Sequence, residues 1–152
     1  MTELKKQLLA EQIQALISAA GILRSSHEKC QIMGAGPGLN NEQMESFEAL
    51  TARFARLSDM IIQQIFRSID VLDLEDSGTV RDRINRAEKK RLIGSAEDFV
   101  QIRMLRNEIA HEYKTETILD IFERVLMLTP PLLQAVENIK RYVGEHYEIL
   151  TI

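Results

Sequence analysis

Three histidines are the candidates for acid–base chemistry in this chain, and one of them has informative neighbours. His111 ends the string Arg-Asn-Glu-Ile-Ala-His, which begins at Arg106. On a helix of about 3.6 residues per turn, Asn107 and His111 lie one turn apart on one face, and Arg106 lies about 140° round the axis from His111. The long arginine side chain is still able to swing toward the imidazole. A proton-transfer group and a permanent cation are therefore expected near one another.

Such a pair has a definite chemical use. A histidine side chain exchanges protons readily near neutral pH, and a guanidinium holds a phosphate and stabilises the extra charge of a pentacoordinate phosphorus. Together they suffice for metal-free cleavage of RNA, in which the substrate's own 2′-hydroxyl is the nucleophile. The same residues are also able to form an ion cluster at the helix end with Glu108 and Glu112. The residues alone leave both interpretations open.

The other histidines favour structural roles, and no metal site or cofactor is predicted. His27 precedes Cys30 by three residues, but a structural zinc site needs four ligands and the chain has no second cysteine. We therefore expect a surface histidine and a buried thiol. His146 lies near the end of the last expected helix, where a cation suits the helix dipole. Glu108 and His111 have the spacing of di-iron bundles, but such a site needs that motif twice.

Helices are the elements that must position these residues. The chain is 45% hydrophobic and only 5% aromatic, with 7 Gly and 3 Pro in 152 residues, which excludes collagen, low-complexity tails and many-turned all-β folds. Its length fits a single domain, residues 1–152. The lone Cys30 and the lack of a visible signal peptide indicate a reducing cytoplasm. No apolar run approaches the roughly 18 residues that a membrane span needs, so no membrane partner is expected.

Apolar periodicity and capping residues predict an all-α, up-and-down helical bundle of about five to six helices, with a short basic helix before the helix that carries the motif. The expected elements are helices over about Thr2 to Gln31, Asn41 to Leu72, Val80 to Ile93 and Ala96 to Tyr113, a short fifth helix capped by Thr115, and a last helix that begins at Thr129-Pro130-Pro131. The glycine-rich stretch Gly34 to Gly38 is interpreted as a turn between helices.

The charges are distributed unevenly along the chain, although the total is −4. Residues 81–106 contain 8 basic and 4 acidic side chains, a net charge of +4, and the flanking segments are acidic. A local field of this kind attracts polyanions. A solvated helix face with ion pairs one turn apart has the same excess of charged residues. Charge alone therefore does not decide between a polyanion-binding surface and a solvated face.

The string from Arg106 to Tyr113, Arg-Asn-Glu-Ile-Ala-His-Glu-Tyr, resembles the signature of HEPN domains. These are helical bundles marked by an arginine, a neighbouring polar residue and a histidine four to six residues on. The ending His-x-Tyr is closer still to the HepT-like toxins of the HEPN/MNT toxin–antitoxin pair. The stretch from Thr79 to Tyr113 is similar to that family as a whole, whereas the first helical hairpin is similar only in pattern.

The resemblance implies a metal-independent endoribonuclease of the cytoplasm. It acts as a homodimer in which the two motifs meet across a cleft. Arg106 and His111 become the catalytic pair and Asn107 the polar neighbour that helps to position them. Tyr113 becomes the tyrosine that an MNT-type nucleotidyltransferase antitoxin modifies with AMP. Dimerisation would double the basic segment, whose expected contacts to the RNA substrate are Arg81, Arg83, Arg86, Lys89, Lys90, Arg91 and Arg103. The alternative is a non-catalytic subunit that binds a nucleotide or serves as a scaffold for a nucleotidyltransferase.

Overall fold

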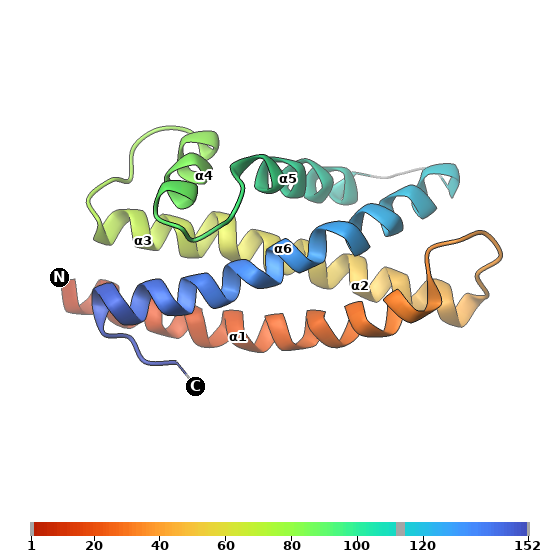
Figure 1. Cartoon of the computed structure of the whole chain (residues 1–152), viewed down its shortest axis with the longest axis horizontal. Coiled ribbons are helices and arrows are strands. Elements are labelled where there is room, and N and C mark those ends of the chain that lie inside the picture. The colour runs from red at the N-terminus through yellow and green to blue at the C-terminus, as the bar shows by residue number, and fades with distance from the viewer. Residues whose placement is uncertain (1, 112–114, 152) are drawn as a thin grey trace.

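The computed structural model describes residues 2–111 and 115–151, and within these ranges it contains only helices and the segments that join them (Figure 1). In chain order the elements are α1 (Thr2–Met33), α2 (Asn41–Asp59), the π-helix η1 (Met60–Ile65), α3 (Phe66–Leu72), α4 (Val80–Lys89), α5 (Ala96–Ala110) and α6 (Thr115–Tyr147). The prediction of an all-α helical bundle is confirmed. None of these helices is long and apolar enough to cross a membrane.

The long helices run up and down beside one another. α1 packs against α2, and α6 packs against both, while α5 lies on α2 and α6 (Figure 1). The short α4 stands at a steep angle to the long helices and contacts η1, α3 and α5. It is the basic helix that the sequence places before the motif helix.

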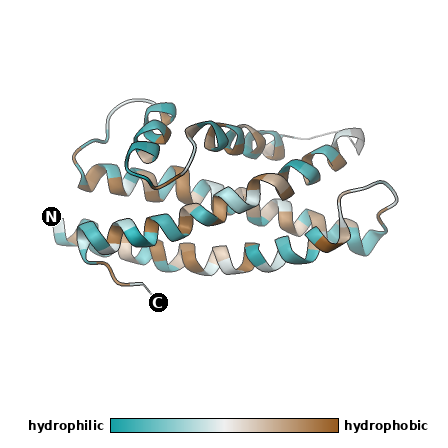
Figure 2. Ribbon diagram, in the orientation of Figure 1, coloured by the Kyte–Doolittle hydropathy of each residue, from teal (hydrophilic) through white to brown (hydrophobic). Residues whose placement is uncertain are grey.

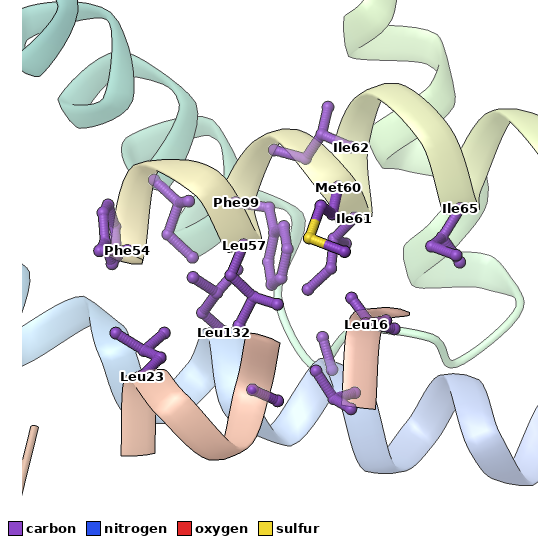
Figure 3. Packing of buried hydrophobic residues seen from close by; sticks show 14 of the residues in the cluster. Leu16, Leu23, Phe54, Leu57, Met60, Ile61, Ile62, Ile65, Phe99 and Leu132 are labelled. Carbon is purple, nitrogen blue, oxygen red and sulfur yellow. The ribbon is translucent and has the colours of Figure 1, made fainter. Parts of the chain in front are cut away.

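The buried faces of the helices form a common hydrophobic cluster. Figure 2 shows hydrophobic residues recurring along the long helices, and Figure 3 shows side chains from α1, α2, η1, α5 and α6 converging on one layer. Phe99 of α5 anchors the motif helix there, 5.9 Å from the ring of Phe66. Burial of such a side chain contributes roughly 1.5–3 kcal/mol. Because Phe99, Ile102 and Leu105 share the buried face of α5, the residues between them point away from the core.

Three helices begin where the capping residues predict. The Asn40 side chain accepts a hydrogen bond from the Gln43 N–H, and the Gln43 side chain accepts one from the Asn40 N–H, which is a complete capping box. Thr79 and Asp82 make the same box at α4. The Ser95 side chain accepts from the backbone N–H of Asp98 and starts α5. The starts of these three helices are therefore predicted correctly from their capping residues.

The second long helix differs from its prediction, because a π-helix interrupts it. Its apolar stripe predicts one α-helix to Leu72, but Met60–Ile65 is wound more widely. The N–H of Phe66 donates to the carbonyl of Ile61, five residues back, and bypasses Ile62. The carbonyl of Ile62 instead accepts a hydrogen bond from Nη1 of Arg83 at 3.2 Å. A side chain of α4 thus satisfies the backbone group that the wider turn releases.

The end of α4 also differs from its prediction, which placed it near Ile93. Arg91 adopts a left-handed backbone with φ of 62°, and the N–H groups of Arg91 and Leu92 bond the carbonyls of Glu88 and Ala87 at 3.0 and 2.9 Å. This is a Schellman ending, which glycine normally provides. The expected stop signal, Gly94, lies three residues too late.

The predicted break at Pro130 is wrong, because α6 is a single helix that contains both prolines. Proline has no N–H for the carbonyl of Leu126, four residues earlier. That carbonyl accepts from Nε2 of His27 at 3.0 Å, so Nε2 must carry the hydrogen. The side chain of Thr129 donates to the carbonyl of Val125 at 2.7 Å. His27 is only 9% exposed, so its prediction as a surface residue is also wrong, whereas Cys30 is fully buried as predicted.

Replacing His27 with alanine is expected to lower the free energy of unfolding by about 1–3 kcal/mol, because it leaves the partly buried Leu126 carbonyl without its side-chain donor. Adding Pro130→Ala restores a backbone N–H at the position that normally bonds this carbonyl. The double variant should therefore lose less than the sum of the two single variants in urea unfolding. Strict additivity would show that the His27 contact does not compensate for the proline.

Candidate active site

α5 carries most of the predicted motif on its exposed side. Ile102 and Leu105 are buried, so Arg103 and Asn107 are exposed and Arg106 is half-buried. The helix ends at Ala110, short of its predicted end at Tyr113, and His111 follows with an extended backbone (φ −87°, ψ 151°). Its N–H still bonds the carbonyls of Asn107 and Glu108 at 3.3 and 3.2 Å, and its side chain is exposed. The helix end therefore presents an accessible imidazole on a fixed backbone.

Arg106 is held by a residue that the sequence analysis missed. Its Nε and Nη2 donate to the two carboxylate oxygens of Asp59 at 2.7 and 2.8 Å. These hydrogen bonds, with the negative charge of Asp59, raise the pKa of Arg106 despite partial burial. Among the described residues the guanidinium contacts Asp59 and makes no hydrogen bond to His111. Its Nη1 group, unbonded within those residues, still has two hydrogens for an anion.

An open groove of about 480 Å³ lies beside this ion pair. Arg103, Arg106 and Asn107 line it from α5, and the opposite wall comes from the end of α2 and from η1, with Ser58, Asp59, Ile62, Gln63 and Gln64. The π-helix begins directly after Asp59. A single groove thus contains one carboxylate, two guanidinium groups and three side-chain amides, which is a suitable set for binding a phosphodiester backbone.

The alternative ion cluster at the end of α5 exists only in part. Glu108 accepts a hydrogen bond from Arg124 of α6, which lowers the pKa of Glu108. Arg124 also lies 3.4 Å from Asp120. This cluster joins α5 to α6 and leaves Arg106 and His111 outside it within the described ranges. Glu112 lies outside the described residues.

The basic segment does not form a single free face. Arg86 and Lys90 pair with Asp70, at 3.0 and 2.9 Å, and Lys90 also reaches Asp73 at 2.7 Å. Burial lowers the pKa of Lys90, but the hydrogen bonds and charges of Asp70 and Asp73 outweigh it, so the pKa is raised overall. These two predicted RNA contacts therefore hold α4 against the end of α3.

The other predicted RNA contacts are more accessible. Arg81, Lys89, Arg91 and Arg103 are exposed, and Arg83 is half-buried against η1. Only Arg103 of this group lines the groove beside Arg106. Tyr113, the predicted site of modification, lies outside the described residues. No group of three or more His, Cys, Asp or Glu side chains that would hold a metal ion lies within residues 2–111 and 115–151.

His146, the remaining histidine, lies in the last turn of α6, as predicted. Its Nδ1 lies 3.0 Å from the carbonyl of Tyr142, four residues earlier on α6, and its ring stacks on that of Tyr142 with centroids 3.9 Å apart. It therefore takes part in the helix ending, far along the chain from the motif.

Comparisons with protein-family models, with curated proteins and with solved structures find no match to this chain.

Proposed function

We propose that this protein is a metal-independent endoribonuclease toxin of a toxin–antitoxin pair, acting in the cytoplasm as a homodimer. The observation that supports this most is the arrangement at the end of α5. Arg106 and Asn107 line an open groove, and His111 stands exposed at the helix end one turn after Asn107. A cation that binds phosphate and a group that transfers protons are thus both accessible on one short segment.

The chemistry needs both groups. The substrate's 2′-hydroxyl loses its proton to an imidazole, and its oxygen bonds to phosphorus. The bond from phosphorus to the 5′-oxygen breaks, and a second imidazole gives that oxygen a proton, which leaves a cyclic phosphate and a free 5′-hydroxyl. Two copies of the chain supply two His111 side chains, so a homodimer provides the base and the acid. Arg106 stabilises the charge on the pentacoordinate phosphorus.

The Asp59 carboxylate fixes the orientation of Arg106 for this task. A bidentate pair uses one edge of the guanidinium and leaves the Nη1 group for the phosphate. The side chains of the pair are 29% and 44% exposed, so solvent screens the negative charge that would otherwise repel the substrate. The function is tested by incubating the purified chain with RNA in EDTA, where cleavage is expected to continue.

The partner in this proposal is an MNT-type nucleotidyltransferase antitoxin. The hydroxyl oxygen of Tyr113 would attack the α-phosphorus of ATP, which transfers AMP to the tyrosine and releases pyrophosphate. Each AMP adds about one negative charge and a purine two residues after His111. RNA phosphate is then excluded by repulsion and by volume.

Tyr113→Phe is expected to gain no AMP when it is incubated with the antitoxin and ATP, because it lacks the accepting hydroxyl. Intact-mass measurement should show one or more AMP units on the wild type and none on this variant. The variant should keep its ribonuclease activity and escape neutralisation by modification. Tyr142→Phe, a change of the same type on α6, is the control and should be modified normally. Equal modification of Tyr113→Phe would assign the acceptor role to another residue.

One observation favours the second candidate, a non-catalytic subunit that binds a nucleotide or acts as a scaffold for a nucleotidyltransferase. Asp59 already satisfies one edge of Arg106, as in an arginine with a structural role. The two functions differ in their effect on a cell. Expression of this chain alone should arrest growth if it is a ribonuclease and should not if it is a scaffold.

A further inference from the structure

Three arginines from three different helices surround the exposed side of the π-helix. Arg83 of α4 donates from Nη1 to the carbonyl of Ile62 and, at 3.4 Å, to the side-chain oxygen of Gln63. Arg103 of α5 lines the groove beside Arg106 together with Gln63 and Gln64. Arg67 of α3 lines a second groove, of about 310 Å³, that has the same two glutamines on its wall. We name Arg67, Arg83 and Arg103 the arginine cluster.

The arginine cluster is short of negative charge. Within the described residues, neither Arg67 nor Arg103 forms an ion pair, and the hydrogen bonds of Arg83 go to neutral oxygens. Burial lowers the pKa of Arg83, and the positive charges of Arg67, Arg86 and Arg103 lower it further, while Asp70 acts in the opposite direction. Arg86, Arg106 and Arg124, by contrast, each have a carboxylate partner. The cluster thus concentrates positive charge, and none of its three members has a carboxylate at ion-pair distance among the residues that the structure describes.

The cluster and the candidate active site are connected. The groove lined by Arg106 and Asn107 shares Gln63 and Gln64 with the groove lined by Arg67, where Lys5 adds a further cation. A chain of phosphates bound at Arg106 is therefore able to contact Arg103, the two glutamine amides and Arg67. Within residues 2–111 and 115–151 no aromatic side chain lines either groove, so those residues offer the bases no stacking surface there.

We propose that Arg67 and Arg103 bind backbone phosphates of the RNA strand next to the scissile phosphate, which lies at Arg106 and His111. The positive charge of Arg83, beside Gln63, attracts the same strand. This inference rests on the proposed ribonuclease function and names how its substrate is held. Contacts of this kind fix the register of the strand without reading its sequence. Single-stranded RNA fits because its phosphates repeat along the groove, whereas a mononucleotide would occupy only one part of it.

The test is a binding measurement that does not depend on cleavage. The probe is a short RNA with 2′-O-methyl groups, which lacks the nucleophile, and fluorescence anisotropy gives its affinity over a range of salt concentrations. The variant is Arg67→Gln with Arg103→Gln, since both side chains are exposed and their loss leaves the core intact. Arg83 is kept because it satisfies the Ile62 carbonyl. The matched control is Arg24→Gln with Lys29→Gln on α1, which removes the same charge.

The double variant should bind more weakly, and its plot of log affinity against log salt should become shallower by about 1.4, because each lost phosphate contact removes roughly 0.7 from the slope for a single strand. The control should keep the wild-type slope. A slope that is unchanged in Arg67→Gln with Arg103→Gln, or changed equally in the control, overturns the proposal.

The failure of this inference is distinguishable from the failure of the proposed function. If His111→Ala loses cleavage but the double variant keeps the wild-type salt slope, the arginine cluster is rejected as a binding site and the ribonuclease function is kept. A reduced slope in a protein that never cuts RNA would support the cluster as a binding site and reject the catalytic assignment.

Discussion

Replacing His111 or Arg106 with alanine is expected to lower RNA cleavage by about 10²–10⁴-fold while the protein stays folded. A general acid or base typically contributes that much, and the loss of a charge stabiliser costs a similar factor. The imidazole of His111 is exposed at the end of α5, so its removal opens no cavity. Loss of Arg106 leaves Asp59, whose half-exposed carboxylate is able to take up water.

The controls for this pair exist within the chain. His146→Ala removes an exposed histidine from the other end of α6, where it bonds only the carbonyl of Tyr142 within the described residues. Arg24→Ala removes an exposed arginine from α1. Both should cut a labelled RNA at the wild-type rate in EDTA. Full activity of His111→Ala under the same conditions would reject the assignment, and inhibition of the wild type by EDTA would reject the metal-free mechanism.

The local features of the fold were predictable because their causes are local. Asn40, Thr79 and Ser95 start helices by bonding backbone groups three residues away, and such signals are visible in the sequence. The exposed face of α5 followed from the spacing of Phe99, Ile102 and Leu105 for the same reason. The sequence therefore predicted the helix that carries Arg106 and Asn107 and the way in which that helix begins. It did not predict the end at Ala110, after which His111 follows with an extended backbone.

The features that were predicted wrongly depend on contacts with residues far away in the sequence. Pro130 stays inside α6 because His27, 99 residues before Leu126, supplies the missing hydrogen bond. The π-helix releases the carbonyl of Ile62, and the side chain of Arg83, 21 residues later in the chain, donates a hydrogen bond to it. Periodicity contains no information about either contact. A helix-breaking signal is decisive only when the fold offers the released carbonyl no other donor.

The candidate site divides in the same way. The motif on α5 was visible in the sequence, but Asp59, which holds Arg106 across 47 residues, was not. The basic segment was visible as a charge excess, and the excess did not show which side chains face inward. Arg86 and Lys90 pair with Asp70, whereas Arg67, outside that segment, joins the arginine cluster. Charge along the chain thus locates a basic region more reliably than it identifies the residues free to bind RNA.

Replacing Asp70 with alanine is expected to lower the free energy of unfolding by about 3–5 kcal/mol, which is the usual cost of removing one partner from a buried ion pair. The Asp70 side chain is 4% exposed, and those of Arg86 and Lys90 are 19% and 10% exposed. Without Asp70 the two cations face one another in a site that excludes most water. Asp73, held by the hydroxyl of Tyr142 at 2.7 Å, compensates Lys90 only in part.

Urea unfolding measures this effect, and Asp76→Ala is the matched control. Asp76 is exposed in the loop before α4, so its loss should change the free energy of unfolding by no more than about 0.5 kcal/mol. Charge reversal at Arg86 and Lys90 would place carboxylates against Asp70. A loss of RNA binding in such a variant would therefore report the unfolding of α4 and not the loss of RNA contacts. If Asp70→Ala is no less stable than Asp76→Ala, the pairs do not hold α4, and Arg86 and Lys90 return to the set of side chains available to the substrate.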